Sequence, residues 1–240
     1  MLRRLVLFWL IASAGACGAA LPYDSIAAKA GRFYAHKEWR SALAMYELML
    51  DERPGNTGTY AQALTAAGAA GDTLAQSRVT RLALLHRVPV DSIFMGVGKA
   101  SVALGEPQIY VSYLGSAAES QPWLRRAADA SLMRYYAWRH DGPETVRYAT
   151  MMLEGLPDDI SFMRCLAQGY LDSGDLAGAE ETYGRILAID PGDYDSLLYL
   201  GNAALERGDK KAGAEYLRRA YSIKPTPYVE SLLVRLQGRR

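Results

Sequence analysis

Two consecutive stretches of this chain align without gaps: ISFMRCLAQGYLDSGDLAGAEETYGRILAIDPGD at residues 160–193 and YDSLLYLGNAALERGDKKAGAEYLRRAYSIKPTP at residues 194–227. The stretches are equally long, and each has a Gly-Asp pair, which begins at Gly174 in the first and at Gly208 in the second. An internal period of this kind indicates one supersecondary unit that is copied along the chain. Such an array offers a long surface for holding a partner, whereas catalysis needs side chains that converge on one site.

The prolines extend this period over most of the chain. Pro157, Pro191 and Pro225 follow one another at equal intervals, which match the length of the two aligned stretches. Pro122 precedes Pro157 by one period and one further position, and Pro54 precedes Pro122 by two periods. Counting backward from the last stretch predicts six units, at about residues 23–56, 57–90, 91–124, 126–159, 160–193 and 194–227.

Apolar and small residues recur at fixed places within the units. In the last unit Leu200 and Ala204 precede the Gly-Asp pair, and Gly213 and Leu217 follow it. This order resembles the tetratricopeptide repeat, which has a period of about 34 residues. That repeat places a large apolar residue, Leu, Gly and Tyr on one helix and Ala, an aromatic residue, Ala and Pro on or just after the next. The resemblance implies an all-α protein, a right-handed α-solenoid of about six helix-turn-helix units over residues 21–240.

The spacing has a physical reason. Apolar residues three or four positions apart form a stripe along one side of a helix, and each pair of helices buries its stripe against its neighbours. Gly71, Gly174 and Gly208 are predicted to take a positive φ between the two helices of their units. The closing prolines are predicted to end the second helices, because a proline nitrogen cannot donate the next hydrogen bond.

Two units depart from the pattern. In the fourth unit His140-Asp141-Gly142-Pro143 stands in place of the usual Gly-Asp turn, which predicts a local shift in the array. In the third unit Tyr110 occupies a position where a small residue is usual, which predicts looser packing between the two helices of that unit.

The array is predicted to end in a capping helix at residues 228–238. Val229, Leu232, Leu233 and Leu236 fall on one side of this segment, while Glu230 and the last arginines face outward. A polar outer side is what the end of a repeat array requires. The alternative is a helix that lies on a membrane surface, which the two terminal positive charges favour only weakly.

The first twenty residues have the three parts of a secretory signal. Residues 1–4 are short and basic, residues 5–12 are strongly apolar, and residues 13–20 are rich in small side chains. A segment of this kind is removed from the mature protein and takes no part in its fold. Residues 1–20 are therefore predicted to be a signal peptide.

Several fates of this segment are left open. Ordinary cleavage before Cys17 or before Leu21 would release a mature chain into the periplasm. Gly15-Ala16-Cys17 also resembles the end of a bacterial lipobox, in which Cys17 would be lipidated and the protein would be an outer-membrane lipoprotein. An uncleaved anchor is the least favoured alternative, because the uncharged stretch is barely long enough to span a membrane. We predict an exported protein that touches a membrane only through a lipid at Cys17.

Composition excludes several function classes. The chain has 27 Lys+Arg and 26 Asp+Glu, and nucleic-acid binding is not predicted, because phosphate binding needs a basic excess. The histidines His36, His86 and His140 lie in different units, with no second ligand at a zinc-binding spacing. Cys165 is predicted to be a small packing residue. No nucleophile, base and orienting group converge, so we predict a non-enzymatic protein with no metal and no cofactor.

The resemblance also implies a binding surface. Tetratricopeptide arrays bind an extended peptide or a partner helix on the concave side, which the first helix of each unit lines. Lys99, Arg134 and Arg164 fall on consecutive first helices, which predicts a basic, partly apolar groove for an acidic or C-terminal peptide of a partner protein. The predicted groove residues are Met95, Lys99, Arg134, Trp138, Arg164, Gln168 and Asn202.

Two classes of function follow from this surface. The preferred one is a protein–protein interaction scaffold in the bacterial envelope. The alternative is an accessory subunit of an envelope enzyme, or a protein that binds a glycan or peptide, in which exposed Trp123 and Trp138 would stack on sugars.

Overall fold

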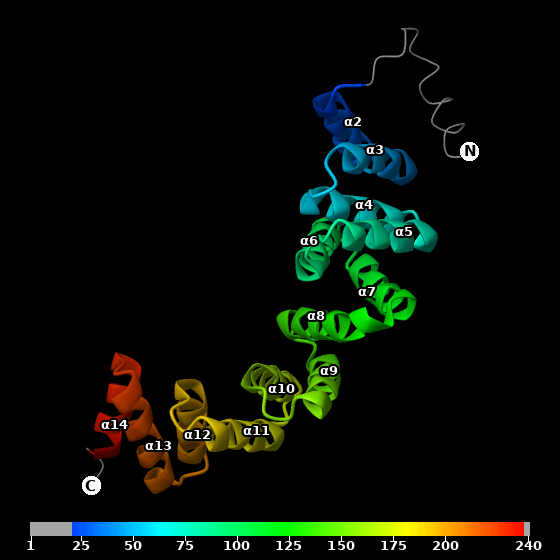
Figure 1. Cartoon of the computed structure of the whole chain (residues 1–240). Helices are drawn as coiled ribbons and strands as arrows, with labels where there is room; N and C mark the ends of the chain where they lie inside the picture. Colours follow the sequence, from blue (N-terminus) through cyan, green and yellow to red (C-terminus); the bar gives the residue numbers. More distant parts are fainter. Residues whose placement is uncertain (1–20, 238–240) are drawn as a thin grey trace. The chain divides into compact units, whose positions relative to one another are not determined.

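The computed structural model describes residues 21–237, and no residue of that range lies in a strand (Figure 1). The predicted all-α class is therefore confirmed. The signal peptide, Cys17 and the last residue of the predicted capping helix lie outside the described residues. The helices are α2 (Tyr23–Ala35), α3 (Trp39–Glu52), α4 (Thr57–Ala69), α5 (Thr73–Leu85), α6 (Val90–Ala103), α7 (Gln108–Ser120), η1 (Pro122–Leu124), α8 (Arg125–Trp138), α9 (Gly142–Gly155), α10 (Ile160–Asp172), α11 (Leu176–Ile189), α12 (Tyr194–Glu206), α13 (Lys210–Ile223) and α14 (Pro227–Gln237).

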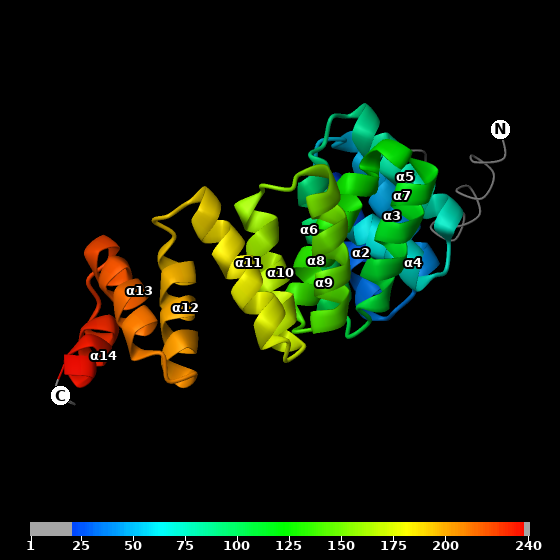
Figure 2. The same cartoon turned by 90° about the horizontal axis from the view of Figure 1, so that it is seen from below.

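The described chain forms two compact units, and the boundary between Tyr113 and Leu114 falls within α7. Within each unit a helix contacts the next helix along the chain, as α2, α3, α4 and α5 do in the first and α8 to α14 do in the second. Figure 2 shows this serial pairing for α10 with α11 and for α12 with α13. Each unit is therefore a stack of helix hairpins.

Left-handed residues close the turns between the paired helices. Gly71, Gly174 and Gly208 have φ values of +70°, +76° and +87°, which confirms the predicted positive φ at these positions. Glycine takes this conformation without a steric penalty because it has no Cβ.

The turn at His140 has the usual geometry in spite of its unusual sequence, and the local shift in the array stays a prediction. His140 has a φ of +54°, its N–H donates to the carbonyl of Ala137, and the N–H of Asp141 donates to the carbonyl of Tyr136. The turn at Gly174 has the same two bonds, from Gly174 to Leu171 and from Asp175 to Tyr170. The sequence HDGP therefore makes the usual turn, with a histidine in the place of the glycine.

The second helices begin and end in a regular way. Asp72, Asp141, Asp175 and Asp209 each accept a hydrogen bond from the backbone N–H three positions later, which satisfies one free donor at the helix start. At the other end α3, α9, α11 and α13 stop just before a proline, with one residue between, as predicted. Pro122 differs, because it opens the short helix η1.

Glycines let neighbouring helices approach closely. A Cβ at Gly201 of α12 would lie 2.9 Å from Leu217 of α13, and a Cβ at Gly98 of α6 would lie 3.3 Å from the ring of Tyr110. Tyr110 is itself buried. Gly98 therefore provides space that the large ring takes up, and the expectation of looser packing in the third unit stays a prediction. Gly96 serves helix packing in the same way, because a Cβ there would lie 2.7 Å from the Cβ of Ala61 on α4.

Helix α14 packs on α13 at the end of the second unit. Val229 is fully buried there, while Leu232 and Leu233 are half-buried and Val234 is exposed. The division of the chain into six units and a capping helix stays a prediction.

Gly201→Ala tests the close approach of α12 and α13. The added methyl group meets Leu217, and overpacking of this kind lowers the free energy of unfolding by about 1–3 kcal/mol. Gly184→Ala in α11 is the matched control, because no atom lies within 4 Å of its added Cβ. Alanine favours a helix over glycine, so this control should raise stability by about 1 kcal/mol. Urea unfolding followed by circular dichroism measures both changes, and equal signs for the two variants would contradict the packing argument.

Candidate partner-binding surface

Three side chains recur at the same place on the first helices of the second unit. Arg134 on α8, Gln168 on α10 and Asn202 on α12 follow one another at the same spacing as Pro157, Pro191 and Pro225. Arg134 is exposed, and the other two are half-buried. We call these residues, together with Trp138 and Arg164, the first-helix surface.

Arg134 has a neutral partner among the described residues. Its guanidinium donates to the hydroxyl of Ser131, with a distance of 3.1 Å from Nη2 to Oγ. Burial raises the pKa of the Cys165 thiol on neighbouring α10, and the nearby charge of Arg134 lessens that rise. Arg134 therefore keeps a positive charge at the surface, while Cys165 stays a protonated, half-buried packing residue.

Arg164 differs from Arg134 because it forms an ion pair with Asp193. Asp193 is buried and caps α12, accepting a hydrogen bond of 2.9 Å from the backbone N–H of Ser196. Burial pushes the pKa of Asp193 up, but the hydrogen bonds from Ser196 and Arg164 outweigh it and lower the pKa below its usual value. The positive charge of Arg164 is thus matched within the protein, and its contact ties α10 to the start of α12.

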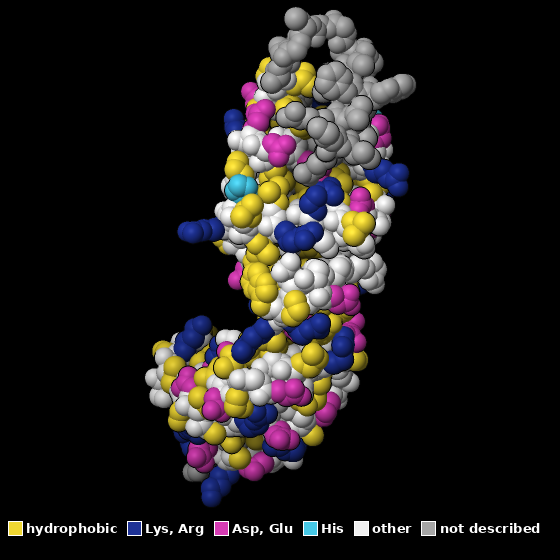
Figure 3. Space-filling model, turned by 45° about the vertical axis from the view of Figure 1, so that its right-hand side comes forward, with side chains coloured by type: hydrophobic (Ala, Val, Ile, Leu, Met, Phe, Trp, Pro, Cys, Tyr) yellow, Lys and Arg dark blue, Asp and Glu magenta, His cyan; other side chains and the backbone are white. Residues whose placement is uncertain are grey.

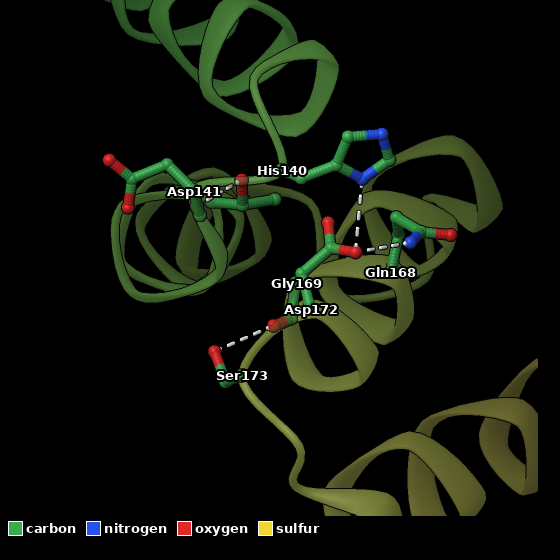
Figure 4. A network of polar contacts seen from close by, with 7 residues as sticks. His140, Asp141, Gln168, Gly169, Asp172 and Ser173 are labelled. Carbon is green, nitrogen blue, oxygen red and sulfur yellow. Dashed lines mark hydrogen bonds and ion pairs between the residues drawn. The ribbon is translucent and has the colours of Figure 1, made fainter.

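A polar cluster surrounds Gln168. His140 Nδ1 lies 3.1 Å from Oδ1 of Asp172, and the amide nitrogen of Gln168 donates to the same oxygen at 2.9 Å (Figure 4). The amide oxygen of Gln168 points away from Asp172 in this view. His140 and Asp172 lie far apart in the sequence, so residue spacing alone does not predict their contact.

An aromatic group lies at the end of α8. Trp138 is 62% exposed, and its ring centroid is 6.3 Å from that of Tyr135. Tyr136 stacks on Tyr148 of α9 with 5.7 Å between the ring centroids. Trp138 therefore contacts the ring of Tyr135 and presents its own apolar ring to solvent, one helical turn from Arg134.

Comparisons with known proteins agree with this architecture. Residues 166–228 match the tetratricopeptide repeat family. The solved structure of PilW, described as a widely conserved type IV pilus biogenesis factor, matches 90% of this chain and 100% of its own at 18% identity, with a TM-score of 0.52.

Residues 166–228 are therefore a tetratricopeptide repeat segment. The C-terminal part of a repeat-containing protein from Cytophaga hutchinsonii is also similar, with 13% identity, 81% of this chain and 77% of that chain covered, and a TM-score of 0.49. Identities this low show a common fold alone. No curated protein matches the chain.

The remaining predicted residues belong to the first unit. Met95 and Lys99 are both exposed and lie one helical turn apart on α6. The first-helix surface of the second unit therefore holds the other predicted residues, and Met95 and Lys99 form a separate exposed pair.

The described residues contain neither a metal-binding cluster nor a membrane-spanning helix. Within residues 21–237 no group of three or more His, Cys, Asp or Glu side chains could hold a metal ion. None of the helices from α2 to α14 has the length and apolar character to cross a membrane. Charged side chains of both signs are interspersed on the face drawn in Figure 3.

Asp193→Asn tests the ion pair between Asp193 and Arg164. Asparagine still caps a helix but cannot pair with Arg164, and we expect a loss of about 1 kcal/mol at pH 7, since Arg164 is half exposed. The pKa of Asp193 is lower in the folded protein than in the unfolded chain, so the ionised carboxylate stabilises the fold at any pH above the unfolded pKa, near 4. This stabilisation is lost as the pH falls through the pKa of the folded state. The difference between the variant and the parent should therefore shrink below about pH 4.

Urea unfolding at pH 7 and at pH 3 measures this difference. Asp175→Asn is the matched control, because Asp175 caps α11 and is exposed. A control that loses as much stability as Asp193→Asn would show that capping alone, rather than the contact with Arg164, explains the effect.

Proposed function

We propose that this protein is a non-enzymatic scaffold that binds a peptide or helix of a partner protein on its first-helix surface. The observation that carries the proposal is the recurrence of Arg134, Gln168 and Asn202 at the same place on α8, α10 and α12. Their side chains supply hydrogen-bond donors, and the two amides also supply acceptors. A regular series of such groups suits the regularly spaced polar groups of an extended chain or a helix.

Trp138 adds an apolar anchor to this surface. Tryptophan and arginine dominate the binding energy of protein interfaces, because each combines a large contact area with few rotatable bonds or with several donors. The exposed ring of Trp138 lies one helical turn from Arg134 on the same helix. Together they offer both kinds of contact within a short distance.

The two arginines of the surface have different roles in the proposal. The guanidinium of Arg164 is matched by Asp193, whereas Arg134 contacts a neutral hydroxyl. An acidic group of the partner would gain more from a cation whose charge is not already matched. We therefore assign recognition of an acidic group to Arg134, and a positioning role to Arg164.

Substitutions at Arg134 and Trp138 test the binding surface. The experiment adds the purified chain to a detergent-solubilised envelope fraction, cross-links it, and identifies the partner by mass spectrometry. Binding is then measured with the purified partner. Arg134→Ala and Trp138→Ala should each weaken binding about tenfold or more, as loss of an interface anchor does.

Two matched controls accompany these variants. Trp123 is 64% exposed, close to the 62% of Trp138, but lies on η1, so Trp123→Ala should bind normally. Arg218→Ala changes an exposed arginine on the second helix α13 and should also bind normally. Equal losses in the variants and the controls would contradict the surface, and capture of a glycan through Trp138 would favour the alternative function instead.

The location in the cell is part of the same proposal. The three-part segment at residues 1–20 supports export to the periplasm or the outer membrane. PilW, with the same fold, is described as a pilus biogenesis factor, which is compatible with a role in an envelope assembly.

Cys17→Ser tests the lipid anchor. If Cys17 is lipidated, cells fed a labelled fatty acid should label the parent chain and not the variant, and the variant should move from the membrane fraction to the periplasm. Cys165→Ser is the control, because Cys165 is half-buried on α10, and it should label as the parent does. A parent chain that is shortened but carries no label would show ordinary cleavage.

A further inference from the structure

The first helices of the second unit change sign of charge along the stack. Arg125, Arg126 and Arg134 on α8 and Arg139 at its end are all exposed. Asp129 is the acidic residue of that helix, and it is half-buried. Helix α8 therefore carries an excess of positive charge, and Arg134 presents part of it on the first-helix surface.

Helix α12 carries the opposite sign. Asp195 and Glu206, near its two ends, are both exposed. The adjacent Arg207 does not cancel them, because its guanidinium pairs with Glu180 of α11. The surface of α12 is therefore acidic.

Helix α10 lies between these two in the chain and presents little accessible charge. The charge of Arg164 is compensated by Asp193, and the carboxylate of Asp172 is only 12% exposed and accepts a hydrogen bond from Gln168. The charges that remain for a partner thus lie at α8 and at α12, with opposite signs.

We propose that the partner segment has opposite charges at its two ends, with its acidic end on α8 and its basic end on α12. The inference rests on the proposed function, since it specifies the occupant of the same surface. Complementary charge selects partners and sets the direction in which they bind. A polyanion such as a nucleic acid or an acidic glycan would meet repulsion at α12.

Two model peptides of about 12 residues, which span about 40 Å when extended, test the direction of binding. One has four glutamates, a neutral middle and four lysines, and the other has the same blocks in the reverse order. Each carries a photo-crosslinker at its acidic end or at its basic end. The full chain is irradiated with each peptide at low ionic strength, where charge pairs are least screened, and mass spectrometry maps the attachment sites.

Acidic-end crosslinks to α8 should exceed those to α12 by about fivefold, the size of one exposed ion pair. The basic ends should show the reverse preference, and both peptides should agree, because charge rather than chain direction sets the orientation. The double variant Arg134→Glu, Glu206→Lys should lose this preference. Lys211→Glu, Glu215→Lys is the matched control, with two exposed charges exchanged on the second helix α13, and it should keep the preference.

The outcomes separate the two proposals. Crosslinks that stay on α8, α10 and α12 without a preference by charge would overturn the polarity and leave the binding surface standing. Crosslinks confined to second helices, or no saturable binding, would overturn both. A salt-sensitive dimer seen by analytical ultracentrifugation, with crosslinks between α8 of one copy and α12 of another, would overturn the peptide as occupant and show that a second copy of this chain occupies the surface.

Discussion

No helix of this protein can bury its apolar stripe alone, and this constraint underlies the rest of the structure. From α2 to α5 and from α8 to α14 each helix packs on the next along the chain, so its stability depends on how closely that neighbour approaches. Gly201 against Leu217 and Gly98 against Tyr110 show how the approach is achieved, with a missing Cβ on one helix and a large side chain on the other. Because protein interiors are close-packed, a larger side chain on one helix requires a smaller one on the helix that it contacts.

The ends of the helices link this packing to the binding surface. The same short aspartate that begins a helix can also fix a side chain of the preceding pair, as Asp193 does when it caps α12 and pairs with Arg164. His140 has a similar double role, since its left-handed backbone closes a turn while its ring contacts Asp172. Residues needed for the fold thus match some charged groups of the surface, and they leave Arg134 and Trp138 exposed.

The two compact units are both built of paired helices but differ in what they expose. Among the first helices of the second unit, α8 has an excess of positive charge, α10 presents little accessible charge, and α12 is acidic. Helix α6 of the first unit instead presents Met95 and Lys99. A repeat array allows this difference, because the residues that pack between helices occupy other positions than those that face a partner. Specificity can therefore vary along a constant scaffold.

The repeat period, the all-helical class, the left-handed glycines and the prolines that follow the second helices could all be predicted from the order of residues alone. These features depend on contacts within one unit, which the regular spacing of glycines and prolines makes visible. The tertiary structure decided which predicted surface residues remain available. Arg164 and Arg134 look alike in sequence, but only folding brings Asp193 to the first and leaves the second beside Ser131. The contact of Arg164 joins α10 to the start of α12, across the whole of α11, and neither helical periodicity nor composition records a contact over such a distance in the chain.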